Sequence, residues 1–335
     1  YIAYRHGLRW EREYQPCELP QAQVTTLRPG GTYLVIGDLE DGLGLIYAKA
    51  LREKLQGKII VLGKASLPEP SDWDTWLASH GEKHPTSQTV QRIKALGREG
   101  VEFAMGSAQL SDPQAVFAEV VQLRERLNEE KIDGLFYADV MGGEASCALA
   151  EMDAAALERI YQNKLEVISS VNLLLKEEEI GFAVLQSTLS SIVGGQGFSA
   201  YAASGAYLDC FASSVDHPQV VAINWDACDL YDDFGEHRSA LMTEAISPEE
   251  VWQATVKILA QPSLKQVIVS PRLLAQRGES HLVRCPTDQF DVLGDDFEAP
   301  RGPVELAVAQ AMGDLLGIQK IGRDDDFFAL GGHSL

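Results

Sequence analysis

The alternation of strand-like and helix-like segments between residues 30 and 275 is the feature that most constrains the fold. Short apolar runs at residues 32–37 and 58–63 have the length and composition of buried strands. Longer segments with helical periodicity separate such runs, for example residues 42–55 and 199–215. Strands that alternate with helices indicate a parallel sheet with helices on both faces. The sequence therefore predicts an α/β fold with a doubly wound, Rossmann-type parallel sheet.

Changes in composition divide the chain into four parts. Residues 1–15 alternate apolar and polar side chains and predict one strand. Residues 16–275 hold the strand-and-helix alternation, and residues 276–300 are a polar predicted linker rich in Asp, Pro and Gly. Residues 301–335 begin with an amphipathic helix and end in a glycine motif. Because both ends fall inside a motif, we expect the chain to be a piece of a longer polypeptide.

The charge balance argues against two classes of partner. The chain has 49 acidic and 28 basic residues, a net charge of -21. Such a surface repels nucleic acid and anionic membranes, so we expect neither as a partner. No apolar run approaches the length of a membrane span. The five cysteines have neither metal-ligand nor disulfide spacing, so we expect no metal site and ordinary thiols in a cytoplasmic protein.

The segment STLSSIVGGQGFSAYAASGAYLD, residues 187–209, joins a strand end rich in hydroxyl groups to a helix that opens with Tyr201. A tyrosine in this setting can protonate a forming alkoxide while a hydroxyl group hydrogen-bonds the same oxygen. Lys164 lies on the apolar stripe of a long helix predicted over residues 155–177. A lysine there needs a partner, and a nearby tyrosine would have its pKa lowered. The alternatives are an ordinary buried tyrosine and a lysine that extends to solvent.

The chain closes with DDDFFALGGHSL, residues 324–335. This motif is similar to the start of a carrier protein, in which the serine after GGH receives a phosphopantetheine arm. Ser334 holds that position. Two preceding glycines would leave the hydroxyl accessible, and an attached phosphate would lie at the start of a helix, where negative charge is favoured. The acidic approach suits recognition by basic partner surfaces.

Together with VVAINWD, residues 220–226, these motifs resemble a modular polyketide synthase or a hybrid polyketide/nonribosomal peptide synthetase. The central part resembles its ketoreductase, a domain similar to the short-chain dehydrogenases/reductases. On this resemblance, residues 1–15 are the last strand of a preceding structural subdomain, and residues 301–335 are the truncated start of an acyl or peptidyl carrier domain. The implied cofactors are NADPH and, on Ser334, 4'-phosphopantetheine. The implied partners are neighbouring synthase domains and carrier-bound acyl intermediates.

The resemblance also assigns catalytic positions. The tyrosine falls on Tyr201, the lysine on Lys164, and the serine position on Thr188, thirteen residues before the tyrosine. Thr188 keeps a hydroxyl group, but its additional methyl group crowds the position. The asparagine expected four residues after the tyrosine falls on Gly205, which has no side chain.

The cofactor positions depart further from the family. Its TGGxGGLG run falls on GDLEDGLG, which starts at Gly37 and fits well only in its last three residues, Gly42, Leu43 and Gly44. Asp38 and Asp41 replace glycines where the backbone must approach the pyrophosphate. Two like charges 4 Å apart repel by about 4 kcal/mol near a protein surface. The run therefore predicts weak dinucleotide binding, although its glycines could serve strand–helix packing alone.

Three further positions concern the same cofactor. An aspartate that usually holds the adenine falls on Gln109, and Asp139 lies near the expected nicotinamide ribose. Lys64 keeps the basic character suited to a 2'-phosphate, although a solvated surface lysine would look the same. Because core segments persist while cofactor residues do not, we expect a reductively inactive ketoreductase-like domain with a structural role. The alternatives are an active NADPH-dependent ketoreductase and a cofactor-free epimerase.

Overall fold

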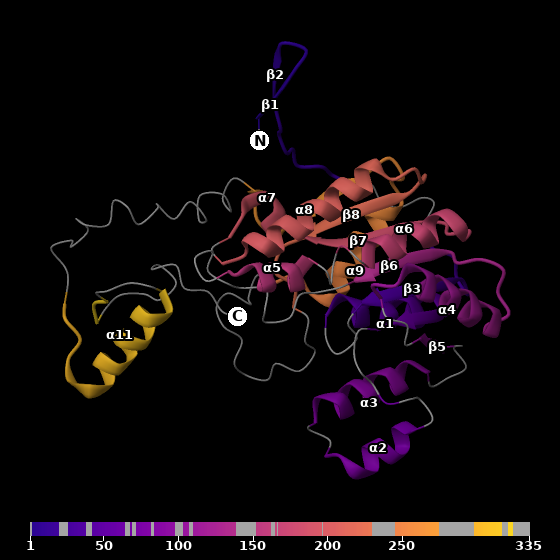
Figure 1. Cartoon of the computed structure of the whole chain (residues 1–335), viewed down its shortest axis with the longest axis horizontal. Helices are drawn as coiled ribbons and strands as arrows, with labels where there is room; N and C mark the ends of the chain where they lie inside the picture. The colour runs from indigo at the N-terminus through magenta and orange to yellow at the C-terminus, as the bar shows by residue number, and fades with distance from the viewer. Residues whose placement is uncertain are drawn as a thin grey trace. The chain divides into compact units, whose positions relative to one another are not determined.

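The structure is a computed structural model, and its elements are shown in Figure 1. It describes residues 2–19, 26–37, 42–63, 68, 72–81, 84–97, 103–106, 110–138, 152–161, 165, 167–195, 197–229, 245–274, 298–316 and 321–323. The chain divides into two compact units, Tyr1–Leu274 and Ala275–Leu335.

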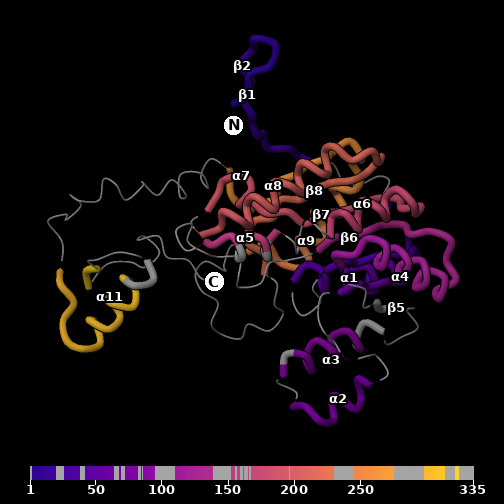
Figure 2. The backbone as a smooth tube through the Cα atoms, in the orientation of Figure 1, coloured from indigo at the N-terminus to yellow at the C-terminus, as the bar shows by residue number. Residues whose placement is uncertain are grey.

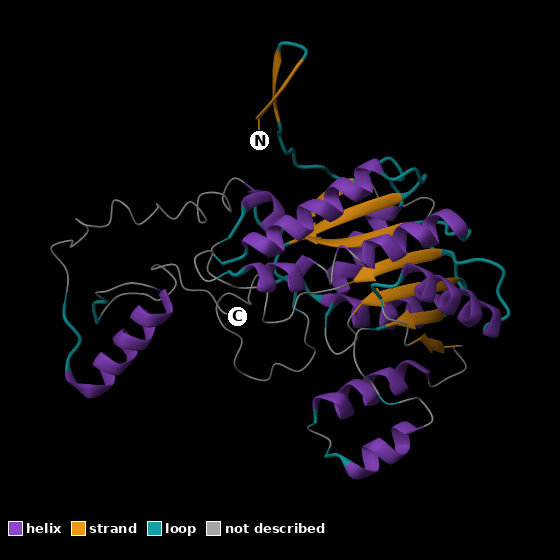
Figure 3. Cartoon of the chain, in the orientation of Figure 1, coloured by secondary structure: helices purple, strands orange, loops and turns teal. Residues whose placement is uncertain are grey.

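A parallel sheet forms the centre of the first unit (Figure 3). In the part of the chain that the structure describes, the sheet has seven strands in the order β5-β4-β3-β6-β7-β8-β9. The strands are β3 (Thr32–Gly37), β4 (Lys58–Leu62), β5 (Phe103–Gly106), β6 (Gly134–Ala138), β7 (Ala183–Thr188), β8 (Val220–Trp225) and β9 (Gln266–Val269). The order runs outward from β3 to β5 and then reverses at β6, which is the doubly wound arrangement. The predicted Rossmann-type sheet is confirmed.

The described part of the first unit contains helices on both faces of this sheet and beside it. They are α1 (Leu43–Leu55), α2 (Trp73–Ser79), α3 (Pro85–Gly97), α4 (Pro113–Arg126), α5 (Ala154–Tyr161), α6 (Val167–Glu177), α7 (Ser190–Val193), α8 (Ser199–Ser214) and α9 (Pro248–Leu259). One hydrophobic cluster joins α1 and α9 to the sheet, and a second joins α4, α6 and α8 to its other face (Figure 1). Tyr33 and Val35 of β3 belong to the first cluster, whereas Leu34 and Ile36 belong to the second. This alternation explains why the strands are apolar throughout.

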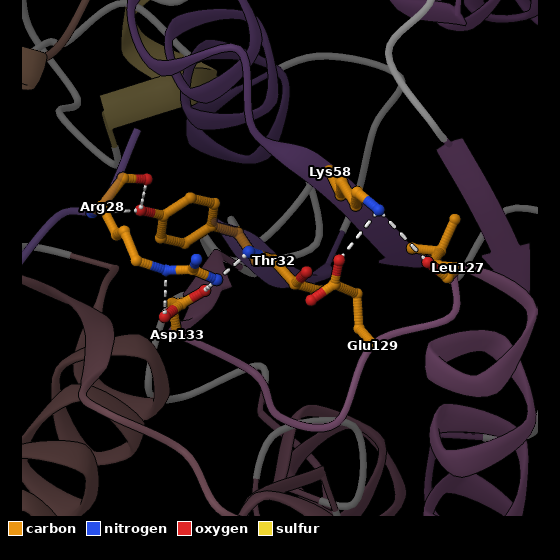
Figure 4. Close-up of polar contacts among 7 residues, drawn as sticks. Arg28, Thr32, Lys58, Leu127, Glu129 and Asp133 are labelled. Carbon is orange, nitrogen blue, oxygen red and sulfur yellow. Dashed lines mark hydrogen bonds and ion pairs between the residues drawn. The ribbon is translucent and has the colours of Figure 1, made fainter. Parts of the chain in front are cut away.

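A polar clamp holds β3 and β6 together at the edge where both strands begin (Figure 4). The Arg28 guanidinium donates two hydrogen bonds to the Asp133 carboxylate, from Nε to Oδ1 at 2.9 Å and from Nη2 to Oδ2 at 2.6 Å. The backbone N–H of Thr32 also donates to Asp133, at 2.8 Å. The hydroxyl group of buried Tyr33 donates to the Arg28 carbonyl oxygen at 2.8 Å, and burial raises the pKa of Tyr33 to about 12.

The N-terminal segment differs from its prediction. Residues 1–15 were expected to hold one strand, but the structure has an antiparallel hairpin of β1 (Ile2–Arg5) and β2 (Leu8–Glu11), which Figure 2 shows turning back on itself. His6 and Gly7 at the turn both have positive φ, 52° and 76°. Two-residue hairpin loops favour this conformation.

Three helical regions also differ from the prediction. The helix predicted over residues 155–177 is described as two helices, α5 and α6, while residues 162–164 and 166 lie outside the described residues. Helices α2 and α9 had no predicted counterpart. Helix α9 has clear local signals, since Ser247 forms a capping box with Glu250 and Pro248 follows at the first helical position.

The second unit contains α11 (Gly302–Leu316), where the sequence predicts an amphipathic helix. Three apolar side chains near its start are exposed: Val304, Leu306 and Val308. Arg323 lies 3.5 Å from a carboxylate oxygen of Glu298 and 3.4 Å from one of Glu305. Across the described residues, no helix has both the length and the apolar character needed to cross a bilayer.

Candidate functional site

The candidate site lies at the edge of the sheet where the strands end. Ligands of doubly wound sheets bind outside the carboxyl ends of the strands, near the point where the strand order reverses. Gly37 is the last residue of β3, and Thr188 is the last residue of β7. Tyr201 lies in the first turn of α8, the helix that packs on β7 and β8. The structure therefore places Tyr201 and Thr188 on elements that meet at this edge.

Thr188 is held firmly at the end of β7. Its side chain is buried, and its hydroxyl oxygen accepts a hydrogen bond from the backbone N–H of Ser190 at 3.1 Å. The hydroxyl group of Ser191 lies 2.8 Å from the Thr188 carbonyl oxygen. These contacts shape the short helix α7 and leave the Thr188 hydroxyl with one hydrogen to donate.

Tyr201 is half-buried near the start of α8. The centre of its ring lies 6.2 Å from that of Phe198, with the two ring planes tilted by 58°. The hydroxyl group of Ser204 donates to the Tyr201 carbonyl oxygen at 2.8 Å. Lys164, the predicted partner of Tyr201, lies outside the described residues. The pairing of Tyr201 with Lys164 therefore stays a prediction.

Gly205, at the expected asparagine position, faces the end of β7 directly. A Cβ atom on Gly205 would lie 2.8 Å from Cγ2 of Thr188, 3.2 Å from Oγ of Ser187 and 3.3 Å from Cβ of Ser191. Non-bonded carbon atoms normally lie about 3.5–4.0 Å apart. The position has no space for a side chain unless its neighbours shift.

A buried polar cluster beneath α8 was not foreseen from the sequence. Nδ2 of Asn224, on β8, lies 3.0 and 2.9 Å from the two carboxylate oxygens of Asp209, on α8. The hydroxyl groups of Ser187 and Ser191 lie 3.0 and 2.8 Å from the same nitrogen. The cluster fixes α8 against β7 and β8. An asparagine within the apolar run VVAINW was the sequence signal that could have revealed it.

Two glycines, Gly37 and Gly42, flank the connection between β3 and α1. Gly37 has φ 148° and Gly42 has φ 101°, values that residues with side chains rarely adopt. Gly44 lies buried in the first turn of α1. The other predicted cofactor residues lie outside the described residues: Asp38, Asp41, Lys64, Gln109 and Asp139.

No group of three or more His, Cys, Asp or Glu side chains within the described ranges could hold a metal ion. Ser334 also lies outside the described residues, so phosphopantetheine attachment there stays a prediction.

Comparison with solved structures agrees with the fold. A C2-type ketoreductase from a modular polyketide synthase superimposes with a TM-score of 0.65 at 19% identity, over 84% of this chain and 57% of that chain. A ketoreductase domain from the bacillaene assembly line gives a TM-score of 0.61 at 20% identity, over 84% and 65% of the two chains. At these identities, the likeness shows the fold alone.

Curated relatives are much longer proteins. The 6-methylsalicylic acid synthase of Aspergillus terreus is 28% identical over 212 residues, covering 62% of this chain and 11% of the synthase. Polyketide synthase PksM of Bacillus subtilis is 24% identical over 269 residues, covering 78% of this chain and 6% of its own length. The chain thus spans about a tenth or less of these relatives.

A family model described as "KR domain" matches residues 31–229. This match covers more than half of the chain and contains the strand order reversal, the positive-φ glycines Gly37 and Gly42, and the segment from Thr188 to Tyr201. The chain therefore belongs to the KR domain family, the ketoreductase family that its motifs resemble.

Proposed function

We propose that this chain is a ketoreductase-like domain of a polyketide or hybrid peptide–polyketide assembly line that no longer reduces its substrate. Its role would be structural: it would space and contact neighbouring synthase domains. The polyketide synthases among its relatives support the setting. The two buried hydrophobic clusters give the domain a complete core, which a structural role requires.

The packing of Gly205 against Thr188 carries the proposal of inactivity. The family pattern expects an asparagine at 205, and a side chain there would collide with Thr188 Cγ2. The turn after β3 adds to this argument, since its sequence has carboxylates at Asp38 and Asp41 where a pyrophosphate would bind. NADPH is the cofactor that the family implies, and the acidic turn would weaken its binding.

Titration with NADPH, followed by fluorescence or calorimetry, tests this proposal. We expect no saturable binding in the micromolar range. A double variant, Asp38→Gly with Asp41→Gly, is the matched comparison, since removing both charges should increase the affinity if repulsion is the cause. Micromolar binding by the unchanged chain would overturn the proposal.

One observation favours an active reductase instead. Tyr201 opens α8 and Thr188 ends β7, so an acid and an oxyanion partner lie on elements that meet at one edge of the sheet. The substrate would be a carrier-bound β-ketoacyl thioester, and Lys164 would lower the pKa of Tyr201. An assay with NADPH and a β-ketoacyl thioester mimic tests this alternative. Turnover that is lost in Tyr201→Phe supports an active reductase, and absence of turnover rules it out. Deuterium wash-out from the α-carbon without NADPH would instead indicate epimerisation.

We also propose that Ser334 carries 4'-phosphopantetheine when a complete carrier domain follows residue 301. The motif GGHS with its acidic approach supports this assignment. The test treats the chain, extended by a full carrier domain, with coenzyme A and a broad-specificity phosphopantetheinyl transferase. We expect a mass gain of one arm that is absent in Ser334→Ala. Modification that persists in the alanine variant would refute it.

A further inference from the structure

We infer that Thr188 and Gly205 form one steric unit, in which the γ-methyl group of Thr188 occupies the volume that a side chain at position 205 would need. The distance of 2.8 Å between Thr188 Cγ2 and a Cβ on Gly205 carries this inference. Both residues are buried, so neither can turn its atoms into solvent. The sequence separates the two residues by a loop and α7, and only the fold brings them together.

The side chain of Thr188 cannot rotate away freely. Its hydroxyl oxygen accepts the backbone N–H of Ser190 at 3.1 Å, and this bond fixes the side-chain torsion that also positions Cγ2. A rotation that moved the methyl group away from Gly205 would break the bond or bury its donor without a partner. A side chain at position 205 would therefore force the backbone of β7 or α8 to shift.

Helix α8 is also held in place, so it cannot move away from the end of β7 without breaking hydrogen bonds. The Gly205 carbonyl oxygen accepts a hydrogen bond from the Ser187 hydroxyl group at 3.2 Å. One turn further along the helix, Asp209 contacts Asn224 and Ser191 inside the core, at 2.9 Å in each case for its Oδ2 atom. These contacts hold α8 close to the strand ends at Gly205 and one turn beyond it.

The pair explains why glycine lies in the interior of α8. Glycine in a helix interior costs about 1 kcal/mol relative to alanine, so close packing is the reason for it here. Thr188 at the family's serine position and Gly205 at its asparagine position are then linked changes, because the methyl group of one fills the space that a side chain at the other would need. A polar side chain can enter position 205 only when residue 188 has lost its γ-methyl group. The proposed loss of reduction uses the same contact, but this steric inference does not depend on whether the domain reduces a substrate.

The test places Gly205→Ala in three backgrounds: Thr188, Thr188→Ser and Thr188→Val. Alanine adds only the Cβ atom. Valine replaces the hydroxyl group with a second γ-methyl group, so two of its three staggered rotamers keep a methyl group facing Gly205 even without the bond to Ser190. We expect Gly205→Ala to lower the thermal midpoint by about 4–8 °C with threonine or valine at 188. With serine at 188, the loss should shrink to less than half, because the remaining contacts of 3.2 and 3.3 Å require only small shifts.

Equal losses in all three backgrounds, or no loss with threonine, would overturn the inference. If Gly205→Ala does not fold with Thr188, recovery of folded protein with Thr188→Ser but not with Thr188→Val supports the pair, and no recovery with either contradicts it. Ser214→Ala, at an exposed position on the same helix, is the control and should give the same small change in every background. NADPH titration of the same variants keeps this result separate from the proposed function.

Discussion

Asp133 is the residue at which pH should act most directly on the stability of the sheet. Burial alone would raise the pKa of its carboxyl group, but hydrogen bonds from the Arg28 side chain and the Thr32 backbone outweigh burial and hold that pKa below its ordinary value. A carboxylate with a lowered folded-state pKa stabilises the fold above its unfolded-state pKa of about 3.9. This contribution is lost as the pH falls through the lower, folded-state pKa.

The variant Asp133→Asn should therefore lower the free energy of unfolding at pH 7 by about 1–3 kcal/mol. The difference from the unchanged protein should shrink as the pH falls below about 4, because the unfolded chain then binds a proton that the native carboxylate still resists. The difference should disappear once the pH passes below the lowered folded-state pKa of Asp133. Urea unfolding at pH 7 and at pH 3 measures both values. Asp74→Asn, at an exposed carboxylate paired with Lys94, is the control and should have little effect. A difference that is independent of pH would contradict the assigned role of the charge.

Three cysteines in the described part of the chain should differ in reactivity. Cys17 and Cys210 are exposed, whereas burial raises the pKa of the Cys228 thiol to about 12, with a smaller contribution from the Asp226 carboxylate. Because the thiolate is the reactive form, native protein at pH 7.5 should be alkylated at Cys17 and Cys210 but not at Cys228. Mass spectrometry of peptides after iodoacetamide treatment checks this. Alkylation of Cys228 at the rate of Cys210 would show the prediction to be wrong.

At the scale of single elements, the packing of α8 on the sheet depends on a buried polar cluster that the hydrophobic periodicity of the sequence does not predict. Asp209→Ala would remove the carboxylate from Asn224 and Ser191 and leave both with fewer partners inside the core. We expect a loss of about 1–3 kcal/mol in the free energy of unfolding, or at least about 2 °C in the thermal midpoint. Ser213→Ala, at an exposed serine one turn away, should change the midpoint far less. A midpoint for Asp209→Ala equal to that control would contradict the role of the cluster.

The elements also show how far the sequence can predict this protein. Strands such as β3 and β8 were predicted because continuous apolar runs are typical of a sheet that is buried on both faces. Thr188 and Tyr201 were placed correctly at the end of β7 and the start of α8, because a motif links them along the chain. The contact between Thr188 and Gly205 could not be predicted, since its distance depends on how closely α8 approaches the strand ends. The hairpin of β1 and β2 was missed because its turn, His6-Gly7, lacks the most familiar turn pairs.

At the scale of the whole molecule, the two compact units raise the question of whether the second contributes to the stability of the first. Both hydrophobic clusters of the sheet draw their buried residues from positions 27 to 259, all within Tyr1–Leu274. In the second unit, α11 exposes Val304, Leu306 and Val308. An apolar helix surface of this kind gains stability only when something covers it.

Removal of residues 275–335 should therefore leave the thermal midpoint of the first unit within about 2 °C of its value in the whole chain, because the sheet and both of its hydrophobic clusters remain complete. Circular dichroism of the whole chain and of residues 1–274 measures the two midpoints. Leu306→Ser in the whole chain is the control, since it changes an exposed side chain of α11 and keeps the chain intact. A drop of several degrees in both variants would mean that α11 covers part of the first unit's surface. We expect neither variant to lower the thermal midpoint. Truncation should remove only the helical signal that α11 contributes to the circular dichroism spectrum.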